Sequence, residues 1–326
     1  MNILVTGGAG YIGSKVSLDL LDKGHNVVII DNLSNSYKRN VPKKSKFYKL
    51  DINEKKKIEK LIIKFKIEAV YHFAAYISVE ESVKFPKKYF NNNYLKTKKF
   101  INLCIKNNIK YFIFSSTASV YGKNLKKVSE NSKIQPNNPY GISKMKVENY
   151  ITKSFGNTNF CILRYFNVAG ADIKLRTGQN SRNNATHLIK RLTETIQNKK
   201  LVFNIYGNNY NTKDGTAVRD FIHIEDLSEI HIKILNYMKK NINKKITIFN
   251  CGYGYGFSVY EIIKITKKIY NFNYKFSKRR KGDAPYVVAS NLKIKKELKW
   301  KEKYKSFFKI IDSALRWENK LKKIRY

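Results

Sequence analysis

A cluster of glycines directly follows the first apolar segment, and this arrangement constrains the fold more than any other feature of the chain. Residues 2–6 are a β-branched and apolar run, typical of a strand buried on both faces of a parallel sheet. Gly7, Gly10 and Gly13 follow with the spacing G-x-x-G-x-x-G, and residues 14–23 then have the apolar pattern of a helix. Strand, glycine turn and helix together form the context that a dinucleotide-binding turn requires.

Each glycine has a physical role in such a turn. Gly7 allows a tight turn, Gly10 lets the backbone approach a pyrophosphate, and Gly13 lets the helix pack closely on the strand. The N-terminus of the helix offers unpaired N–H groups to phosphates. A second predicted strand, 26–31, ends at Asp31, whose carboxylate can accept hydrogen bonds from a ribose 2′-hydroxyl and would repel a 2′-phosphate. The pattern favours NAD over NADP; the alternative is a glycine-rich turn that binds no ligand.

Apolar and helical segments alternate through the first half of the chain. Predicted strands are 2–6, 26–31, 46–50, 68–73, 111–115, 159–165 and 246–250, and predicted helices lie near 14–23, 54–65, 86–107, 140–155 and 226–240. This alternation predicts an α/β fold, a Rossmann-like doubly wound parallel sheet. Because it becomes irregular after residue 168, we expect an NAD-binding domain at 1–168 and a smaller mixed α/β substrate domain at 169–326. Residues 226–252 are expected to return to the first domain.

The net charge of +41 raises the question of a polyanionic partner. Only ten of the 65 basic residues are arginine, and the lysines are spread over every predicted helix and turn. A spread distribution indicates a solvated surface, so no specific nucleic-acid partner is expected, although weak polyanion binding at low salt is. Because lysine is the usual basic residue of this chain, the few positions that carry arginine are candidates for a specific role.

The remaining composition predicts a protein of a reducing compartment, the cytoplasm, without a membrane segment. No apolar run is long enough to cross a bilayer, and no leading signal sequence is expected because the first strand begins at residue 2. Cys104, Cys161 and Cys251 lie far apart within apolar runs, which is typical of small core residues in a reducing compartment.

Ligand-binding residues of a doubly wound sheet lie where its strands end. Asp51 and Ile52 follow one strand and could meet an adenine, although Asp51 could equally be a helix N-cap. Small residues in Phe73-Ala74-Ala75 would let the backbone approach a cofactor, whereas His72 before them is expected to be a core histidine. A hydroxyl-rich turn runs from Ser115 to Gly122, and Asn167 follows the strand 159–165.

Tyr140 and Lys144 are expected to share one face of a helix that begins at Pro139. Free tyrosine has a pKa of about 10 and is a poor base at neutral pH. A nearby ammonium, together with the positive charge of an oxidised nicotinamide, would favour the phenolate and lower that pKa. Tyr-x-x-x-Lys alone is a weak signal. After a dinucleotide turn and a strand-end Ser/Thr, it predicts a catalytic acid/base.

These motifs resemble the extended short-chain dehydrogenase/reductases, and among them the UDP-glucose (UDP-galactose) 4-epimerases, over nearly the whole chain. The motifs that carry the resemblance are Thr6-Gly-Gly-Ala-Gly-Tyr-Ile-Gly13, Asp31-Asn-Leu33, Phe114-Ser-Ser-Thr-Ala-Ser-Val-Tyr-Gly122, Tyr140-x-x-x-Lys144, Arg164-Tyr-Phe-Asn167, Asp214-Gly-Thr-Ala-Val-Arg-Asp220, Ile222-His-Ile-Glu-Asp226 and Arg279-Arg-Lys-Gly-Asp283. The first and fourth are shared across the superfamily. The segments 214–226 and 279–283 are closer to the 4-epimerases.

The resemblance implies NAD-dependent inversion at C4 of a UDP-sugar through a transient 4-keto intermediate. Tyr140 would be the acid/base on the 4-hydroxyl, Lys144 would bind the nicotinamide ribose, and Thr117 would hydrogen-bond the reacting oxygen. Residues expected to hold the substrate are Thr117, Asn167, His187, Tyr206, Arg219, Arg280, Asp283 and Val287. Residues expected to hold the cofactor are Gly7, Gly10, Tyr11, Ile12, Gly13, Asp31, Asn32, Asp51, Ile52, Phe73, Ala74, Ala75, Asn93, Ser115, Tyr140, Lys144 and Tyr165.

Departures from the family pattern bear on the substrate. The loop 172–186 shares little with the usual epimerase segment, and Ile77 stands where some members have lysine. Val287 occupies the position that restricts the sugar pocket, and valine is smaller than the tyrosine of strict hexose epimerases. We therefore expect UDP-N-acetylhexosamines to be accepted besides UDP-glucose, and a UDP-pentose 4-epimerase is an alternative.

Two further alternatives follow from the same residues. A nucleotide-sugar 4,6-dehydratase would carry Asp-Glu after the strand-end threonine, where this chain has Ala118-Ser119. A non-enzymatic NAD-sensing or polyanion-binding protein would not need Thr117, Tyr140 and Lys144.

Two expectations concern partners and metals. No metal site is expected, because His223, Glu225, Asp226 and His231 lack recognised ligand spacing. The family suggests a homodimer packed through the helices near 86–107 and 140–155.

Overall fold

The computed structural model describes residues 1–122, 127–154, 156–182, 186–280 and 282–325. Within these ranges, the central feature is a seven-stranded parallel sheet with the strand order β11-β6-β5-β4-β1-β2-β3. Its strands are β1 (Asn2–Thr6), β2 (Asn26–Ile30), β3 (Lys46–Tyr48), β4 (Ala69–His72), β5 (Tyr111–Thr117), β6 (Asn159–Tyr165) and β11 (Ile246–Cys251). The predicted doubly wound sheet is confirmed, and each predicted strand agrees with an observed one to within two residues at either end.

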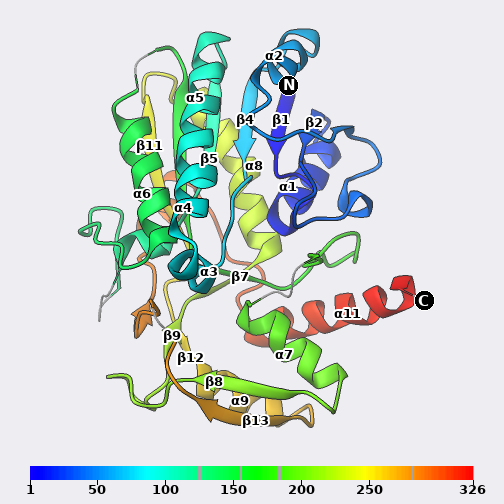
Figure 1. Ribbon diagram of the computed structural model, residues 1–326, viewed down its shortest axis with the longest axis vertical. Helices are drawn as coiled ribbons and strands as arrows, with labels where there is room; N and C mark the ends of the chain where they lie inside the picture. The colour runs from blue at the N-terminus through cyan, green and yellow to red at the C-terminus, as the bar shows by residue number, and fades with distance from the viewer. Residues whose placement is uncertain (123–126, 155, 183–185, 281, 326) are drawn as a thin grey trace.

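Helices cover both faces of the sheet (Figure 1). The strands are apolar on both sides: Ile3 and Val5 face one cluster of buried side chains, and Leu4 faces the other. Helices α1 (Tyr11–Asp22) and α8 (Ile224–Lys240) pack into the first cluster. Helices α2 (Lys55–Lys64), α5 (Thr97–Lys106) and α6 (Pro139–Thr152) pack into the second. The core therefore lies in two layers, one on each side of the sheet.

The predicted helix at 86–107 is interrupted. It consists of α4 (Pro86–Tyr89), a π-helical segment η2 (Phe90–Lys96) and α5. A π-helical turn widens the backbone locally and is frequent at functional sites. Here it carries Asn93, whose side chain accepts a hydrogen bond from Tyr76 N at 2.9 Å and donates to Tyr76 O at 2.9 Å. The interruption therefore anchors the chain segment that follows β4.

The C-terminal part of the chain adds short sheets below the central one (Figure 1). Strand β7 (Asn167–Ala169) pairs with β10 (Phe221–His223), β9 (Val218–Arg219) with β12 (Phe257–Ser258) and β14 (Tyr286–Val287), and β8 (Val202–Tyr206) with β13 (Asn273–Ser277). The remaining helices are α3 (Val79–Lys84), α7 (Leu188–Gln197), α9 (Val259–Lys267), α10 (Leu292–Leu298) and α11 (Phe307–Arg325), with short 3₁₀ turns η1 (Lys38–Asn40) and η3 (Ala118–Tyr121). No helix in the described ranges is both long and apolar enough to span a membrane.

A buried ionic cluster joins α1 to the C-terminal part. The Lys15 ammonium is 2 % exposed and lies 2.8 Å from Asp19, 2.9 Å from Asp172 and 2.8 Å from Glu225. Burial alone would raise the pKa of Asp172, but hydrogen bonds from Arg176 and the charge of Lys15 outweigh it and hold that pKa well below its ordinary value. The helix that begins at the glycine turn is thereby fixed against the loop that leaves β7.

We predict that Asp172→Asn lowers the free energy of unfolding at pH 7 by about 3 kcal/mol, because it removes one partner of a buried ion pair. Urea denaturation measures the change, and Asp312→Asn, in an exposed pair with Arg316, should change it by less than about 0.5 kcal/mol. Since the folded-state pKa is lowered, the stabilisation is present above the ordinary carboxyl pKa of about 4 and disappears as the pH falls below it. Equal stabilities of wild type and Asp172→Asn at pH 7 would contradict this role.

Candidate active site

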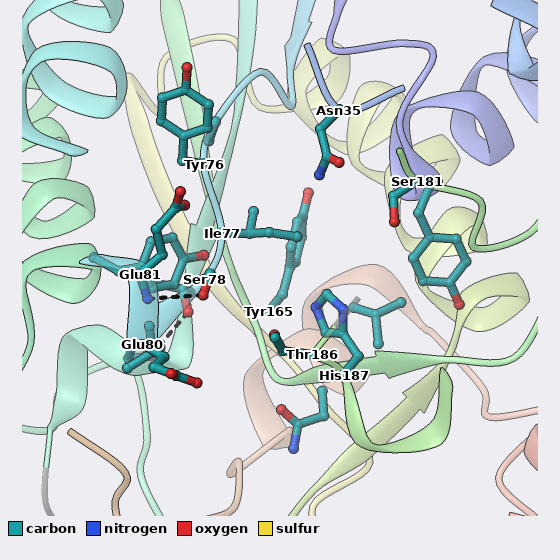
Figure 2. Close-up of a pocket in the computed structure, with 18 of the residues that line it drawn as sticks. Asn35, Tyr76, Ile77, Ser78, Glu80, Glu81, Tyr165, Ser181, Thr186 and His187 are labelled. Carbon is teal, nitrogen blue, oxygen red and sulfur yellow. Dashed lines mark hydrogen bonds between the residues drawn. The ribbon is translucent and has the colours of Figure 1, made fainter. Parts of the chain in front are cut away.

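A large cleft of about 1030 Å³ lies at the carboxyl ends of the central strands, as expected for a doubly wound sheet. Of the predicted cofactor and substrate residues, all except Asn93 line it. Asn93 is 1 % exposed and lies behind the wall, bonded to the backbone of Tyr76. In Figure 2, Tyr165 and Ile77 occupy the middle of this cleft, with Glu80 and Glu81 on one side and Ser181 and His187 on the other.

The glycine turn forms a cradle that larger residues would fill. A Cβ on Gly13 would lie 2.3 Å from the Gly7 carbonyl oxygen, and one on Gly7 would lie 2.7 Å from Ala74 N. Gly7 also has a φ of +70°, which favours glycine. Helix α1 begins after Gly10 without a side-chain cap, so its first N–H groups face the cleft unpaired by side chains. These features fit the pyrophosphate of a dinucleotide.

Two aspartates that follow strands of the central sheet also line the cleft: Asp31 after β2 and Asp51 after β3. Asp31 is 8 % exposed, and its carboxylate accepts hydrogen bonds from Ala9 N at 3.0 Å and Leu33 N at 2.8 Å. Burial raises the pKa of Asp31, and these two hydrogen bonds oppose the rise. The position of Asp31 at the end of β2 places an acceptor at the edge of the cleft.

Asp51 is not a helix N-cap, because Glu54 occupies that position of α2. Its carboxylate lies 2.9 Å from the Lys96 ammonium and accepts a hydrogen bond from Asn32 Nδ2 at 3.1 Å. The helix N-cap alternative is therefore wrong; Asp51 lines the cleft, and its contact with an adenine stays a prediction. Lys96 was missed by sequence reasoning, because it lies 45 residues away in a lysine-rich segment.

Tyr140, Lys144 and Thr117 come together where β5 and α6 meet. Asn138 caps α6 by accepting a hydrogen bond from Gly141 N at 2.8 Å, which fixes the first turn that carries Tyr140. The Lys144 ammonium is buried and donates to the Ser115 carbonyl at 2.7 Å. The Thr117 hydroxyl lies close enough to the Tyr140 phenol to favour its ionised form. The strand end and the helix therefore present two hydroxyls and one amine to the same part of the cleft.

Burial dominates the titration of this group. It lowers the pKa of Lys144 to about 7, opposed by the charge of Glu148. It raises the pKa of Tyr140 to about 12, opposed by the hydrogen bond with Thr117. The lowering of the Tyr140 pKa that the sequence led us to expect is thus not produced by the protein groups alone. A positive charge brought into the cleft beside the phenol would be needed to favour the phenolate.

Two aromatic side chains that line the cleft, Tyr165 and Phe73, both contact His231. The Tyr165 hydroxyl lies 2.7 Å from His231 Nε2, and His231 Nδ1 donates to the Leu227 carbonyl at 2.8 Å. Nδ1 therefore carries the proton and Nε2 accepts from Tyr165. The Phe73 ring packs on His231 with ring centroids 5.3 Å apart. Sequence reasoning considered His231 only as a metal ligand and missed this role.

His72 is a core histidine, as predicted. Its Nδ1 lies 2.7 Å from the Thr6 hydroxyl and its Nε2 lies 3.1 Å from the Thr97 hydroxyl. Burial lowers its pKa to about 3, so it is neutral at physiological pH. In the described ranges, no group of three or more histidine, cysteine, aspartate or glutamate side chains is arranged to hold a metal ion.

Two arginines that form no close ion pair, Arg219 and Arg280, also line the cleft, and Arg219 Nη1 donates to the Val218 carbonyl at 2.9 Å. The Arg280 guanidinium lies over the Tyr206 ring, 3.7 Å from its centroid, and its Nε has no hydrogen-bond partner among the described residues. Arg219 lies on β9 beside Val287 of β14. Within the described ranges, neither arginine forms an ion pair with a carboxylate at bridging distance, although Asp283 is near enough to raise the pKa of Arg219 against the lowering by burial. Two guanidinium groups without acidic partners favour an anionic ligand.

His187 and Asn167 line the cleft as well. His187 immediately precedes α7, and the Gln179 side-chain amide donates to its Nδ1 at 2.7 Å. Its ring faces the cleft (Figure 2). Asn167 begins β7 and borders the same space. The sequence positions that were expected to hold a nucleotide-sugar thus gather opposite Thr117 and Tyr140.

Comparisons with known proteins agree with this geometry. Residues 3–252 match the model of the NAD dependent epimerase/dehydratase family. A UDP-glucose 4-epimerase of Lactobacillus helveticus is 38 % identical over 323 residues, which cover 97 % of either chain.

Two solved structures extend the similarity to the fold. That of a UDP-glucose 4-epimerase from Stenotrophomonas maltophila, with bound NAD and formylated UDP-arabinopyranose, has a TM-score of 0.92 and 30 % identity and covers 99 % of both chains. That of the UDP-Glc/GlcNAc 4-epimerase of Campylobacter jejuni has a TM-score of 0.82 and 39 % identity and covers 98 % of this chain and 99 % of its own. The chain described here belongs to the NAD dependent epimerase/dehydratase family.

Proposed function

We propose that this protein is an NAD-dependent UDP-sugar 4-epimerase that interconverts UDP-glucose and UDP-galactose. The observation that carries the proposal is that Thr117, Tyr140 and Lys144 line one cleft together with the glycine turn and two arginines that form no close ion pair. The similarity to UDP-glucose 4-epimerases over the full length supports the same activity.

The residues of the cleft fit the cofactor and divide into a cofactor half and a substrate half. Gly7, Gly10 and Gly13 would accept the pyrophosphate, and Asp31 would accept hydrogen bonds from the adenosine ribose. Asp51 and Ile52 would border the adenine. The floor formed by Phe73 and Tyr165, with Ala74, Ala75 and Ser115 beside it, would meet the nicotinamide; Tyr11, Ile12 and Asn32 complete the set.

Proton transfer is assigned to Tyr140. Bound NAD supplies a reversible acceptor for the hydride from sugar C4 and a positive charge beside the phenol. Tyr140 would take the proton from the 4-hydroxyl as that hydride leaves, and would return it when the hydride comes back to the other face of the 4-keto sugar. Thr117 would hold the reacting oxygen, and Lys144 would hold the nicotinamide ribose while its charge favours the Tyr140 phenolate.

Inversion requires a firmly held nucleotide and a sugar that can turn. The diphosphate would be bound by Arg219, Arg280 and His187. The uridine would be bound by Tyr206, Asp283 and Asn167. Binding energy from these remote contacts keeps the 4-keto sugar in the cleft while it rotates about its link to the diphosphate. The alternative 4,6-dehydratase reaction needs an additional acid after Thr117, and Ala118 and Ser119 of η3 do not provide one.

We further propose the expected organisation in two domains, 1–168 and 169–326. The pairing of β11 with β6 and the packing of α8 on the central sheet support the return of residues 226–252 to the first. A homodimer through α4, η2, α5 and α6 is proposed from family resemblance, and the exposed Leu95 on η2 is compatible with it. The three free cysteines are buried, which fits the cytoplasm.

Tyr140→Phe is predicted to lower kcat for UDP-glucose by about 10³-fold, because the phenol oxygen that moves the proton is removed. NAD content, measured by absorbance of the cofactor released on denaturation, should remain that of the wild type. Tyr150→Phe is the matched control, since Tyr150 lies on the same helix and bonds to Asn102 at the surface. Undiminished turnover in Tyr140→Phe would refute the catalytic assignment.

Val287 is predicted to admit an N-acetyl group at the sugar pocket, so that the wild type epimerises both UDP-glucose and UDP-N-acetylglucosamine. Val287→Tyr should lower kcat/KM for the N-acetylated substrate by more than about tenfold while sparing UDP-glucose, because the larger ring fills the pocket. Ile63→Tyr, on the exposed surface of α2, is the control. If the wild type turns over UDP-glucose well and UDP-N-acetylglucosamine not at all, dual specificity is excluded. Including UDP-xylose in the same assay tests the pentose alternative.

A further inference from the structure

One buried carboxylate lies on the same face of α6 as the reacting groups. Tyr140, Lys144 and Glu148 follow each other at intervals of four residues, which places them in a row along the helix. Glu148 is 4 % exposed and forms a two-point ion pair with Arg164, which is 3 % exposed. Arg164 Nη2 lies 2.7 Å from Oε2, and Arg164 Nε lies 3.2 Å from Oε1. The mechanism described above uses neither residue.

The partners of Glu148 are the immediate neighbours of the site residues. The Ser116 hydroxyl donates to Glu148, and Ser116 lies between Ser115, which receives the Lys144 hydrogen bond, and Thr117. Arg164 precedes Tyr165. Ser116 pairs with Arg164 across the β5–β6 ladder, so one carboxylate contacts both strands that end at the site. Glu148 thereby fixes α6 against β5 and β6 one helical turn from Lys144.

The pair also dominates the charge around Lys144. The groups around its ammonium are Tyr140 and Glu148 on α6, the Phe114 ring and the Ser115 carbonyl on β5, and His72 on β4. Arg164 on β6 adds its charge to this set as the ion-pair partner of Glu148. His72 is neutral at physiological pH, and the Tyr140 phenol is protonated unless a cation favours its ionisation. The fixed charges of this set are therefore the anion of Glu148 and the cation of Arg164. If one of them is removed, the other is left uncompensated in a buried site.

We propose that Glu148 is a positioning residue that holds α6 against the strand ends, and that the balance between its charge and that of Arg164 sets the protonation of Lys144 beside Tyr140. The proposal rests on the proposed function for its catalytic consequence. Its electrostatic part concerns Lys144 itself and can be measured without turnover.

The test is the pH dependence of kcat for Glu148→Gln, Arg164→Gln and the double variant. Glu148→Gln leaves the Arg164 cation uncompensated. This cation disfavours the charged form of Lys144 and favours the Tyr140 phenolate. Both the acid limb and the alkaline limb of the pH profile of kcat should therefore shift to lower pH by about one unit. Arg164→Gln leaves the Glu148 anion uncompensated, and both limbs should shift to higher pH by about one unit. The double variant should return to the wild-type profile.

NMR of the NAD-loaded protein labelled with ¹³C-lysine, over a pH series, provides the second readout, because the shift of the Lys144 Cε signal reports the ionisation of this buried amine directly; Lys144→Met identifies the signal. The midpoint of this shift should move in the same directions as the kcat profile. Glu59→Gln, which neutralises a carboxylate paired with Lys106 at the surface, is the matched control and should shift neither. If Glu148→Gln does not fold, Arg164→Gln and the double variant still differ only in the Glu148 charge and give the same sign test.

Opposite shifts that cancel in the double variant support the proposal. Shifts of both single variants in the same direction, or loss of activity without any movement of the Lys144 NMR midpoint, would overturn it. A wild type that does not epimerise any UDP-sugar would refute the proposed function instead, while the NMR series would still decide the electrostatic role of the pair.

Discussion

The site depends on the burial of the Lys144 ammonium between helix α6 and the end of strand β5. Its hydrogen bond to the Ser115 carbonyl fixes how closely α6 approaches β5, and the cap by Asn138 fixes where α6 begins. Burial of an ammonium opposes its charge, and it brings the pKa of Lys144 to about 7. The chain therefore holds an amine close to the midpoint of its titration next to a phenol, where small changes in local charge alter the protonation of both.

The charged groups on the two sides of the cleft differ in sign and in the partners that hold them. On the cofactor side, acids such as Asp31 and Asp51 are held by backbone N–H groups or by Lys96, and the glycine turn leaves the first N–H groups of α1 open. On the substrate side, Arg219 and Arg280 have no carboxylate partner at bridging distance in the described part of the chain. A cationic wall opposite a dinucleotide cradle suits a ligand that carries a diphosphate at a distance from its reacting carbon.

Much of this arrangement could be predicted from sequence because it follows from local patterns. The glycine spacing, the alternation of strands and helices and the Tyr140/Lys144 spacing each involve neighbouring residues, and the observed sheet confirms the fold. The scarcity of arginine also drew attention to Arg219 and Arg280. What sequence could not supply are partners that meet only in the folded chain: Lys96 with Asp51, His231 with Tyr165, and Arg164 with Glu148. The π-helical break at η2 was missed for the same reason, since the contact of Asn93 with the Tyr76 backbone forms only in the folded chain. The acidity expected for Tyr140 also failed to emerge from protein groups alone, because burial raises the pKa of a phenol more than the hydrogen bond with Thr117 lowers it.

The central claim is that a hydride leaves C4 of a UDP-sugar and returns to the same carbon within one closed cleft. The most direct measurement is proton and deuterium NMR of the reaction of the purified protein, without added NAD, on UDP-glucose deuterated at C4. The account predicts UDP-galactose with the deuterium still at C4, because the cofactor returns the same hydride without exchange with solvent. Loss of the label to water, a 6-deoxy-4-keto product, or no conversion by protein that carries NAD would contradict it.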